Sequence, residues 1–367
     1  MTFGARALIR LGALKKNLRV IREAAPDAKV MAVIKANAYG HGMLAVARSL
    51  EGADALAVAR LPEALQLHES GIEKPIVLLA GVLTPLELEE ALLRGFEIVV
   101  HCIEQVELLE GAAGGATTVW LKVDTGMNRL GFSAEEASGL IERLRSCPAV
   151  AELRLMSHLA SADELDNPAT RNQLALFRTV VEEFEGAVSI ANTPGALGWQ
   201  DIADARETLG INGDQWIRMG LALYGVSPFA DRSGAALGLT PVMQFEARLI
   251  AVKPLPEGAR VGYRGRYQAQ SDSMLGIISA GYGDGYSRHF RTGTPVLLNG
   301  RQVPLIGNVS MDMIAVDLGT GASDKVGDIA TLWGPGLPVE EVAHWADAIP
   351  YELVCGVMNR EESEIVD

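Results

Sequence analysis

A lysine closes the first strongly apolar segment of the chain. Lys35 lies near the end of residues 30–36 (VMAVIKA) and is followed by Tyr39 and by glycines at positions 40 and 42. Burial lowers the pKa of a lysine, and the neutral amine can then form a Schiff base with a carbonyl compound. A lone lysine at the end of a strand more often only reaches water. The flanking glycines and Tyr39 favour the chemical role here.

Two later segments could bind a phosphate group. Residues 192–195 (NTPG), which include Thr193, follow one apolar run, and residues 218–225 (RMGLALYG) cover another. Backbone N–H groups bind phosphate well, and barrels often use the loops after their last two strands for this purpose. The alternative is that these glycines only turn the chain into the next domain. A lysine opposite a phosphate cradle is the pairing that pyridoxal phosphate needs.

Other polar residues follow further apolar runs. Lys122, Asp124 and Arg129 surround the end of one run, and His158 ends the next. The first three could form only a network of ion pairs, and the histidine fits a satisfied core position as well as a catalytic one. The three cysteines and six histidines contain no C-x-x-C and no H-E-x-x-H. We therefore expect no metal site and favour a reducing compartment.

The elements that position these residues follow from the apolar pattern. Short, nearly continuous apolar runs alternate with amphipathic stretches, which is typical of parallel strands buried on both faces. This pattern predicts an α/β fold, a (β/α)₈ barrel. An open doubly wound sheet is the alternative, but no glycine-rich dinucleotide fingerprint follows the first run. The eight runs are residues 30–36, 55–60, 75–81, 97–101, 118–125, 152–158, 187–192 and 216–224.

The pattern changes after about residue 225. Short strand-like segments separated by Gly, Pro and Asn-Gly turns predict a mostly antiparallel, all-β domain. We place the barrel at residues 1–230 and the β domain at 231–367, and the first ~8 residues could join the β domain. Strands are expected at 243–252, 274–279, 295–298, 313–317 and 328–333, with a short helix at 338–346.

Composition excludes two classes of partner. The chain has 367 residues and a formal net charge of −14, which opposes binding to the phosphates of a nucleic acid. It has no long uncharged apolar run and no signal-peptide core. We therefore expect a soluble, cytoplasmic protein with neither a nucleic-acid nor a membrane partner.

Several motifs together resemble those of the alanine racemases. Residues 33–42 (VIKANAYGHG) are similar to the family's pyridoxal-phosphate attachment motif. The other motifs follow in the family's order: residues 121–131 (LKVDTGMNRLG), 218–225 (RMGLALYG), 281–285 (GYGDG), 307–312 (GNVSMD) and 351–353 (YEL). The resemblance spans essentially the whole chain. It implies a barrel followed by a β domain, bound pyridoxal phosphate, and a homodimer whose active sites are shared between the two subunits.

The resemblance also implies roles for single residues. Lys35 would form the Schiff base with pyridoxal phosphate, and Tyr263 would be a second catalytic base supplied by the partner subunit. Arg129 and the backbone amide of Met311 would bind the substrate carboxylate. Lys122 would position Arg129 and can be carbamylated in the family.

Further residues would support the site or bind the cofactor. Arg218 would lie at the pyridine nitrogen, and His158 would link Arg218 to Tyr263. Asp312 would support the loop that carries Met311. The cofactor-binding residues implied by the resemblance are Lys35, Tyr39, His158, Thr193, Arg218, Gly220, Leu221 and Tyr351.

The implied reaction interconverts L-alanine and D-alanine by removing a proton from one face of Cα and returning one to the other. Lys35 and Tyr263 would serve the two faces, so neither base has to move around the carbon. Arg218 would bond to the ring nitrogen without protonating it, because a guanidinium keeps its proton. A poorer electron sink then disfavours transamination.

Three alternatives stay open at this point. A barrel-fold pyridoxal-phosphate decarboxylase would typically place an acidic residue where Arg218 stands. A non-catalytic pyridoxal-phosphate carrier would need neither a β domain nor Tyr263. A broad-specificity racemase is harder to separate, because one methylene or hydroxyl changes discrimination by only ~1–3 kcal/mol. Ser310, where the family often has Cys, leaves the breadth toward serine open, and the sequence fits either D-alanine supply for peptidoglycan or alanine catabolism.

Overall fold

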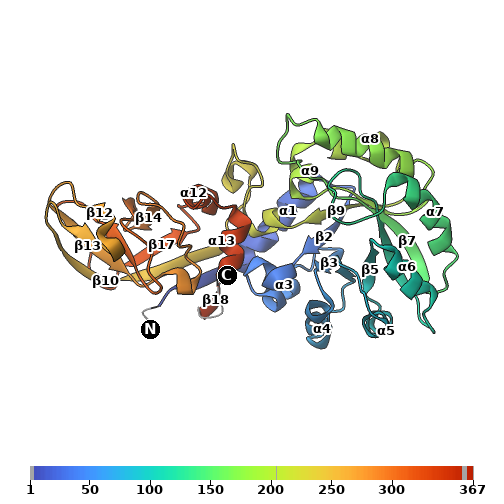
Figure 1. Ribbon diagram of the computed structural model, residues 1–367, viewed down its shortest axis with the longest axis horizontal. Coiled ribbons are helices and arrows are strands. Elements are labelled where there is room, and N and C mark those ends of the chain that lie inside the picture. Colours follow the sequence, from blue (N-terminus) through green and yellow to red (C-terminus); the bar gives the residue numbers. More distant parts are fainter. Residues whose placement is uncertain (1–3, 204, 358–361, 367) are drawn as a thin grey trace.

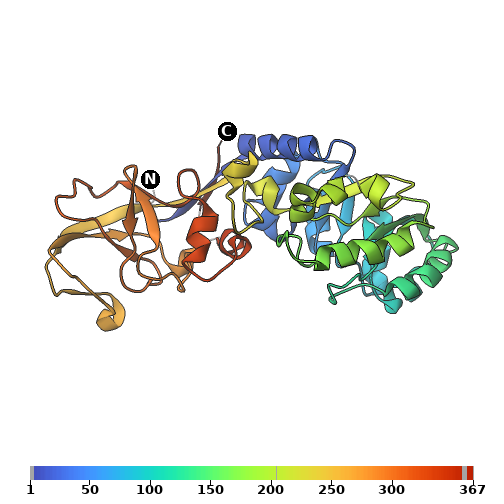
Figure 2. The same cartoon turned by 90° about the horizontal axis from the view of Figure 1, so that it is seen from above.

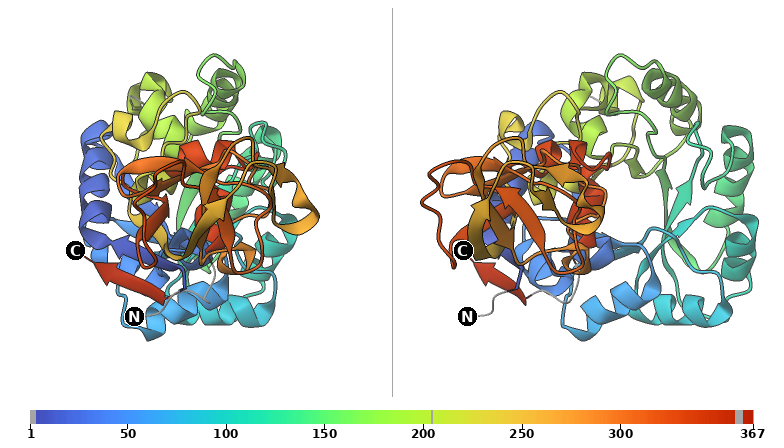
Figure 3. Two further views of the ribbon diagram at one scale, coloured as in Figure 1. Left: turned by 90° about the vertical axis from the view of Figure 1, so that its left-hand side faces the viewer. Right: turned by 60° about the vertical axis from the view of Figure 1, so that its left-hand side comes forward.

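The chain forms a barrel and a β domain that lie side by side along its long axis (Figure 1). The computed structural model describes residues 4–203, 205–357 and 362–366. Viewed along the long axis, the β domain lies in front of the barrel (left panel of Figure 3).

Eight parallel strands close into the barrel, and their order around it follows the sequence. Each strand lies within or overlaps one of the eight apolar runs, so the predicted (β/α)₈ class is confirmed. The strand side chains are mostly buried, because helices cover one face and the packed barrel interior covers the other. The strands are β2 (Lys29–Val33), β3 (Ala55–Val58), β4 (Ile76–Leu78), β5 (Glu97–Val100), β6 (Thr117–Lys122), β7 (Val150–Met156), β8 (Val188–Ser189) and β9 (Gln215–Met219).

Helices surround the barrel, as Figure 2 shows for α1 in blue and for α7 and α8 in green. Two of the helices, α5 and α7, begin with a side-chain cap: Thr84 accepts the Glu87 N–H at 3.3 Å, and Ser133 and Glu136 cap each other's backbone N–H groups. The helices are α1 (Leu11–Ala24), α3 (Met43–Ser49), α4 (Leu61–Glu69), α5 (Pro85–Arg94), α6 (Ile103–Glu110), α7 (Ala134–Arg145), α8 (Ala169–Val181), α9 (Thr193–Gly198), α10 (Gln200–Ala203) and α11 (Ala205–Thr208).

The last barrel strand is shorter than its apolar run indicated. We expected residues 216–224 to be extended, but β9 ends at Met219 and Leu221–Tyr224 form a 3₁₀ turn, η1. Gly220 separates the two with φ −115° and ψ −95°. Because strand and helix interiors can both be continuously apolar, the run alone does not reveal this change.

The β domain is built on one mixed sheet with strand order β15-β14-β17-β10-β1-β18, and β13 pairs with both β10 and β16. The antiparallel pairing predicted for its central strands is confirmed. Its elements are β10 (Met243–Leu255), β11 (Arg260–Val261), β12 (Tyr267–Gln268), β13 (Ser273–Ile278), β14 (Pro295–Leu298), β15 (Arg301–Pro304), β16 (Ile314–Asp317), β17 (Ile329–Trp333), α12 (Val339–His344), α13 (Pro350–Gly356) and the short turns η2 (Gly234–Leu237), η3 (Tyr263–Gly265) and η4 (Tyr282–Asp284).

The two ends of the chain pair with each other inside this sheet. Strand β1 (Arg6–Arg10) is antiparallel to β10 and parallel to β18 (Glu362–Val366). Arg6 also forms an ion pair with the buried carboxylate of Glu246 at 2.7 Å. The first strand therefore lies in the β domain by its hydrogen bonds, although it directly precedes the first helix of the barrel.

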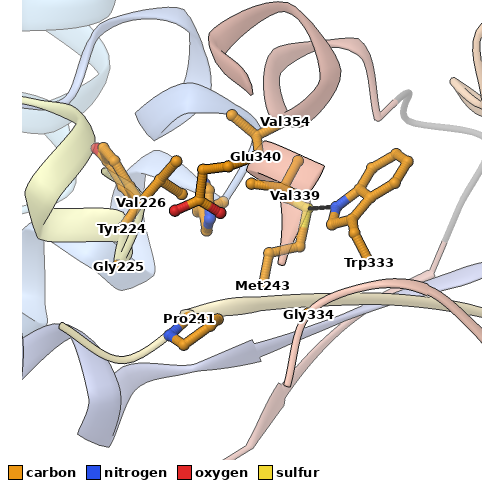
Figure 4. A pocket seen from close by; sticks show the side chains of 11 residues that line it. Tyr224, Gly225, Val226, Pro241, Met243, Trp333, Gly334, Val339, Glu340 and Val354 are labelled. Carbon is orange, nitrogen blue, oxygen red and sulfur yellow. Dashed lines mark hydrogen bonds between the residues drawn. The ribbon is translucent and has the colours of Figure 1, made fainter. Parts of the chain in front are cut away.

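A small cavity lies where the barrel meets the β domain (Figure 4). Its volume of about 10 Å³ is enough for about one water molecule. His41, Tyr224 and Gly225 line it from the barrel side, and Met243, Trp333, Glu340 and Val354 line it from the β domain. Figure 4 also shows the Trp333 indole N–H directed at the Met243 sulfur, 3.4 Å away.

The amino-terminal end of the barrel is closed by a buried ion pair between two tryptophans. Glu97 accepts the Trp120 Nε1–H at 2.6 Å and lies 3.3 Å from Arg154. The Arg154 guanidinium lies 5.2 Å from the Trp120 ring and 5.3 Å from the Trp216 ring, within cation–π range. This cluster stabilises the end of the barrel opposite the carboxyl ends of the strands.

Replacing Glu97 by Ala should lower the free energy of unfolding by about 3 kcal/mol, because it leaves a buried indole N–H and part of a buried guanidinium without an acceptor. Glu152→Ala is the matched control. Glu152 also pairs with Arg154, at 2.6 Å, but its side chain is 49% exposed, so its loss should cost less than about 1 kcal/mol. Urea unfolding of both variants measures the difference. Equal losses would contradict the buried-pair account.

Candidate active site

The segment after the first barrel strand is a left-handed turn. Strand β2 ends at Val33, three residues before the end of the expected run, and Lys35 opens the turn α2 (Lys35–Tyr39). Four consecutive residues without glycine, 36–39, have φ between 52° and 55°. Each such residue costs roughly 1–2 kcal/mol, so contacts elsewhere must hold the turn.

Side chains from three places hold this turn. The His41 Nδ1 bonds to the carbonyls of Ala38 at 3.0 Å and Tyr39 at 2.8 Å. Asn37 Oδ1 accepts the Met43 N–H at 2.9 Å and so caps α3. Glu63, from the first turn of α4, accepts the N–H of the residue that directly follows Lys35. The turn therefore presents a fixed lysine at the carboxyl end of β2.

Cations surround Lys35 at the mouth of the barrel. The pKa of the Lys35 amine is lowered by its burial and by Arg129, while Glu63 and Cys355 oppose that shift. Burial, Arg218 and Arg129 lower the pKa of Lys122 to about 8. Both lysines therefore have access to the neutral amine, as the chemical interpretation of Lys35 requires.

Arg218 lies within this cluster and is held by several hydrogen bonds. It donates to the Ser189 hydroxyl at 2.6 Å, to the Ser157 carbonyl at 2.6 Å and to the Ile190 carbonyl at 3.2 Å. Its pKa falls to about 9 through burial, so it remains protonated at neutral pH. Its Nη2 also lies 3.3 Å from the His158 Nδ1.

His158 is held neutral by these neighbours. Burial lowers the pKa of His158 to about 2, and repulsion by Arg218, Lys122, Arg129 and Lys35 contributes. Since Arg218 can only donate, Nδ1 of His158 accepts, and the remaining proton is on Nε2. The histidine therefore offers an N–H donor on the side away from Arg218.

A compact polar shell lies next to Tyr39. The Thr193 hydroxyl accepts the Gly220 N–H at 3.1 Å, and Leu221 begins η1 beside it. A Cβ at Gly220 would lie 2.6 Å from the Tyr39 hydroxyl, so only glycine fits there. The Tyr39 ring lies 5.9 Å from that of Tyr351, on α13. Burial raises the pKa of both tyrosines, so both hydroxyl groups remain protonated donors.

The loop that carries Arg129 is fixed by Asp124 and by a buried glutamine. Asp124 Oδ1 accepts the backbone N–H of Gly126 at 2.9 Å and of Asn128 at 3.1 Å. Gln173, on α8, donates to the Thr125 hydroxyl at 3.1 Å and to the His158 carbonyl at 2.9 Å. These bonds join the loop after β6 to the loop after β7. Asp124 therefore shapes the loop, and its charge also opposes the lowering of the Lys122 pKa.

The remaining three predicted residues lie in the β domain. Tyr263 is 68% exposed and Met311 is 52% exposed, and Asp312 is exposed beside it. Tyr263 lies in η3, between β11 and β12, and β12 lies at the end of the β domain remote from the barrel in Figures 1 and 2. One chain therefore does not bring Tyr263 and Lys35 together.

The glycine-rich segment 281–285 supports Met311. It forms the short turn η4, and the Gly283 N–H donates to the Met311 carbonyl at 2.9 Å. A Cβ at Gly281 would lie 2.3 Å from the carbonyl oxygens of Ser310 and Met311. Glycine is required at this position because two backbones touch.

Three residues of the site, Glu63, Gln173 and Tyr224, were not predicted from the sequence. Tyr224 lies with its ring 4.9 Å from Tyr39 and 4.4 Å from His41. Only Glu63 had a local signal, a glutamate in the first turn of a helix that has Pro62 at its start. The other two are recognised only by their contacts.

Within the described ranges, no group of three acidic, His or Cys side chains could hold a metal ion, and no helix is long and apolar enough to cross a membrane.

Comparison with known proteins matches both parts of the chain to the same family. Residues 9–228 match the family model "Alanine racemase, N-terminal domain", and residues 242–365 match "Alanine racemase, C-terminal domain". The alanine racemase of Vibrio cholerae is 47% identical over 360 residues, which cover 98% of this chain and 97% of that protein. That of Aeromonas hydrophila is 47% identical over 362 residues, covering 98% and 99%.

Solved structures agree with this. The biosynthetic alanine racemase from Pseudomonas aeruginosa superposes with a TM-score of 0.93 at 38% identity, covering 100% of both chains. The alanine racemase from Bartonella henselae, solved with covalently bound pyridoxal phosphate, has a TM-score of 0.87 at 29% identity, covering 99% of both chains. Two family models that together match most of the residues, and relatives at this identity over nearly full length, show that the chain belongs to the alanine racemase family.

Proposed function

We propose that this chain is an alanine racemase that interconverts L-alanine and D-alanine with pyridoxal phosphate bound at Lys35. The observation that carries the proposal is the half-buried Lys35 at the carboxyl end of β2, among cations that favour its neutral amine. Catalytic groups in barrels of this kind lie at this end of the strands. The curated relatives named above support the same reaction.

The residues at the mouth of the barrel fit pyridoxal phosphate. The Gly220 backbone and the Tyr39 hydroxyl lie so close that a Cβ at Gly220 would be 2.6 Å from that hydroxyl, so a backbone and a side-chain donor for a phosphate lie side by side. Thr193, Gly220, Leu221, Tyr39 and Tyr351 would bind the phosphate. When bound, the cofactor would delocalise the electron pair left at Cα after a proton is removed.

Arg218 would lie against the ring nitrogen of the cofactor. Its hydrogen bonds to Ser157, Ser189 and Ile190 fix the guanidinium plane, so it can donate to that nitrogen without giving up its proton. A ring that stays unprotonated withdraws fewer electrons, which favours rapid return of the proton to Cα over transamination.

Tyr263 would be the base on the second face, supplied by a partner subunit. Within one chain Tyr263 is remote from Lys35 and 68% exposed, so it is available to a second copy. The neutral His158, with its Nε2–H directed away from Arg218, would donate to the Tyr263 oxygen and stabilise its deprotonated form. The protein would therefore act as a homodimer with shared sites.

The substrate carboxylate would be bound from both subunits. Arg129 would supply its guanidinium and the partner's loop would supply the Met311 amide, with Asp312 supporting that loop.

We propose a boundary between barrel and β domain near residue 230, and the two family models separate between 228 and 242. Strand β1 is the exception, because its hydrogen bonds are made in the second sheet.

The first test follows the Cα proton. Incubation of the protein and pyridoxal phosphate with L-alanine in D₂O should yield D-alanine with deuterium at Cα, because the returned proton comes from solvent-exchanged bases. Lys35→Ala should lower the rate at least about a thousandfold. Lys29→Ala, at the opposite end of β2, should keep the wild-type rate. Chiral separation and NMR measure both products, and parallel samples with L-serine and L-lysine define the breadth of the substrate range.

The absence of deuterium exchange in every sample, despite covalently bound pyridoxal phosphate, would contradict the racemase. It would favour the decarboxylase or the carrier instead.

Lys122 should be carbamylated. As pH rises through about 8, the neutral amine becomes the main form of Lys122, and only that form reacts with CO₂. We expect ¹³C-bicarbonate to give a protein carbamate signal in ¹³C NMR that is lost in Lys122→Arg, which keeps the charge. Lys74→Arg, at a half-buried lysine outside the site whose amine donates to the Glu51 carbonyl at 2.8 Å, is the matched control and should keep the signal. A signal of equal size in Lys122→Arg would show that another amine carries the carbamate.

A further inference from the structure

The left-handed turn after Lys35 depends on a carboxylate from a neighbouring helix. Glu63 lies in the first turn of α4 and uses both of its oxygens. Oε1 accepts the Ala36 N–H at 2.7 Å, and Oε2 accepts the N–H groups of Ala59 at 2.8 Å and Arg60 at 3.1 Å. One side chain thus joins the backbone next to Lys35 to the loop that follows β3.

These bonds restrain the backbone at the point where the chain enters the left-handed region. Ala36 is the first residue of the turn with positive φ, at 52°. Its N–H belongs to the same peptide group as the Lys35 carbonyl, so the bond to Glu63 fixes the peptide plane on the carboxyl side of the lysine. Charge-assisted hydrogen bonds of this kind are shorter and stronger than neutral ones.

Glu63 also contributes a negative charge at a cationic site. The charged and titratable groups that act on or beside Lys35 come from several elements, and Glu63 is the carboxylate among those that act on the Lys35 amine. They are Glu63 on α4, Lys122 at the end of β6, Arg129 in the loop after β6, His158 after β7 and Cys355 on α13. Glu63 therefore opposes the repulsion that Arg129 exerts on the lysine.

We propose that Glu63 is a positioning residue for Lys35, which holds the left-handed turn through the Ala36 amide and balances the charge of Arg129 at the lysine amine. The proposal rests on the proposed role of Lys35 in binding pyridoxal phosphate. Glu63 touches neither reacting atoms nor the cofactor shell described above, and acts through the backbone and its charge.

Two substitutions separate the effect of the Glu63 hydrogen bonds on the turn from the effect of its charge on the Lys35 amine. Glu63→Gln removes the charge and replaces one acceptor oxygen by an NH₂ group, which cannot accept the N–H groups. Glu63→Asp keeps the charge but is one methylene shorter. Glu87→Gln is the matched control, since Glu87 lies in the first turn of the next helix, α5, and accepts the Leu83 N–H at 2.9 Å.

The experiment follows covalent binding of pyridoxal phosphate to the cofactor-free protein by absorbance across a pH series, with borohydride reduction and mass spectrometry to locate the adduct. Glu63→Gln should move the midpoint of the rate profile to lower pH, because a carboxylate that favours the ammonium form is gone. It should also lower the limiting rate at high pH about tenfold or more, because the amine is misplaced. Glu63→Asp should lower the limiting rate but keep the wild-type midpoint. Glu87→Gln should change neither.

Failure of the proposed role of Glu63 can be distinguished from failure of the proposed role of Lys35. An adduct that persists in Lys35→Ala would overturn the proposed role of Lys35. A Glu63→Gln protein with both wild-type midpoint and wild-type limiting rate would overturn the role of Glu63 alone, as would equal effects in Glu87→Gln. If Glu63→Gln does not fold, the limiting rate of Glu63→Asp decides, and a wild-type value there refutes the proposal.

Discussion

Repulsion among clustered cations is the constraint to which the mouth of the barrel is adapted. Lys35, Lys122, Arg129 and Arg218 act on one another or on His158, although the chain as a whole carries a net charge of −14. Burial and mutual repulsion lower the pKa of both lysines and keep the histidine neutral. Such a site gains from any anion that enters it. The phosphate of a cofactor, the carboxylate of a substrate and a carbamate on a lysine would each relieve the same repulsion.

The two ends of the barrel differ in whether their positive charges are paired with carboxylates. At the amino-terminal end, Arg154 is matched by Glu97 and lies between tryptophan rings, so its charge is compensated inside one chain. At the carboxyl end, the described residues form no such ion pair with the cations around Lys35, although the charge of Glu63 acts on Lys35 and that of Asp124 on Lys122. Charge that is left unmatched is available for binding and for tuning a base. Hydrogen bonds from surrounding groups offset the free-energy cost of burying these charges, and those of Arg218 are the clearest example.

The sequence predicted the parts of the structure that depend on local pattern. Buried parallel strands have a continuous apolar signal, and the lysine after the first of them stood out because it interrupts that signal. The left-handed turn gave no such signal, since alanines and an asparagine fill it and the contacts of His41 and Glu63 hold it. The pairing of β1 with β18 joins residues more than 350 positions apart, which no local pattern can reveal. The separation of Tyr263 from Lys35 is likewise a property of the assembled domains.

We propose that one site needs Lys35 from one chain and Tyr263 from another. Co-expression of a Lys35→Ala chain and a Tyr263→Phe chain with different tags, followed by purification on both tags, gives a hybrid dimer. One of its two sites contains both substitutions and the other contains neither. A shared site should let the hybrid recover about half of the wild-type racemase activity, while each parent homodimer is inactive. A hybrid as inactive as its parents would contradict the shared site and would place both bases within one chain.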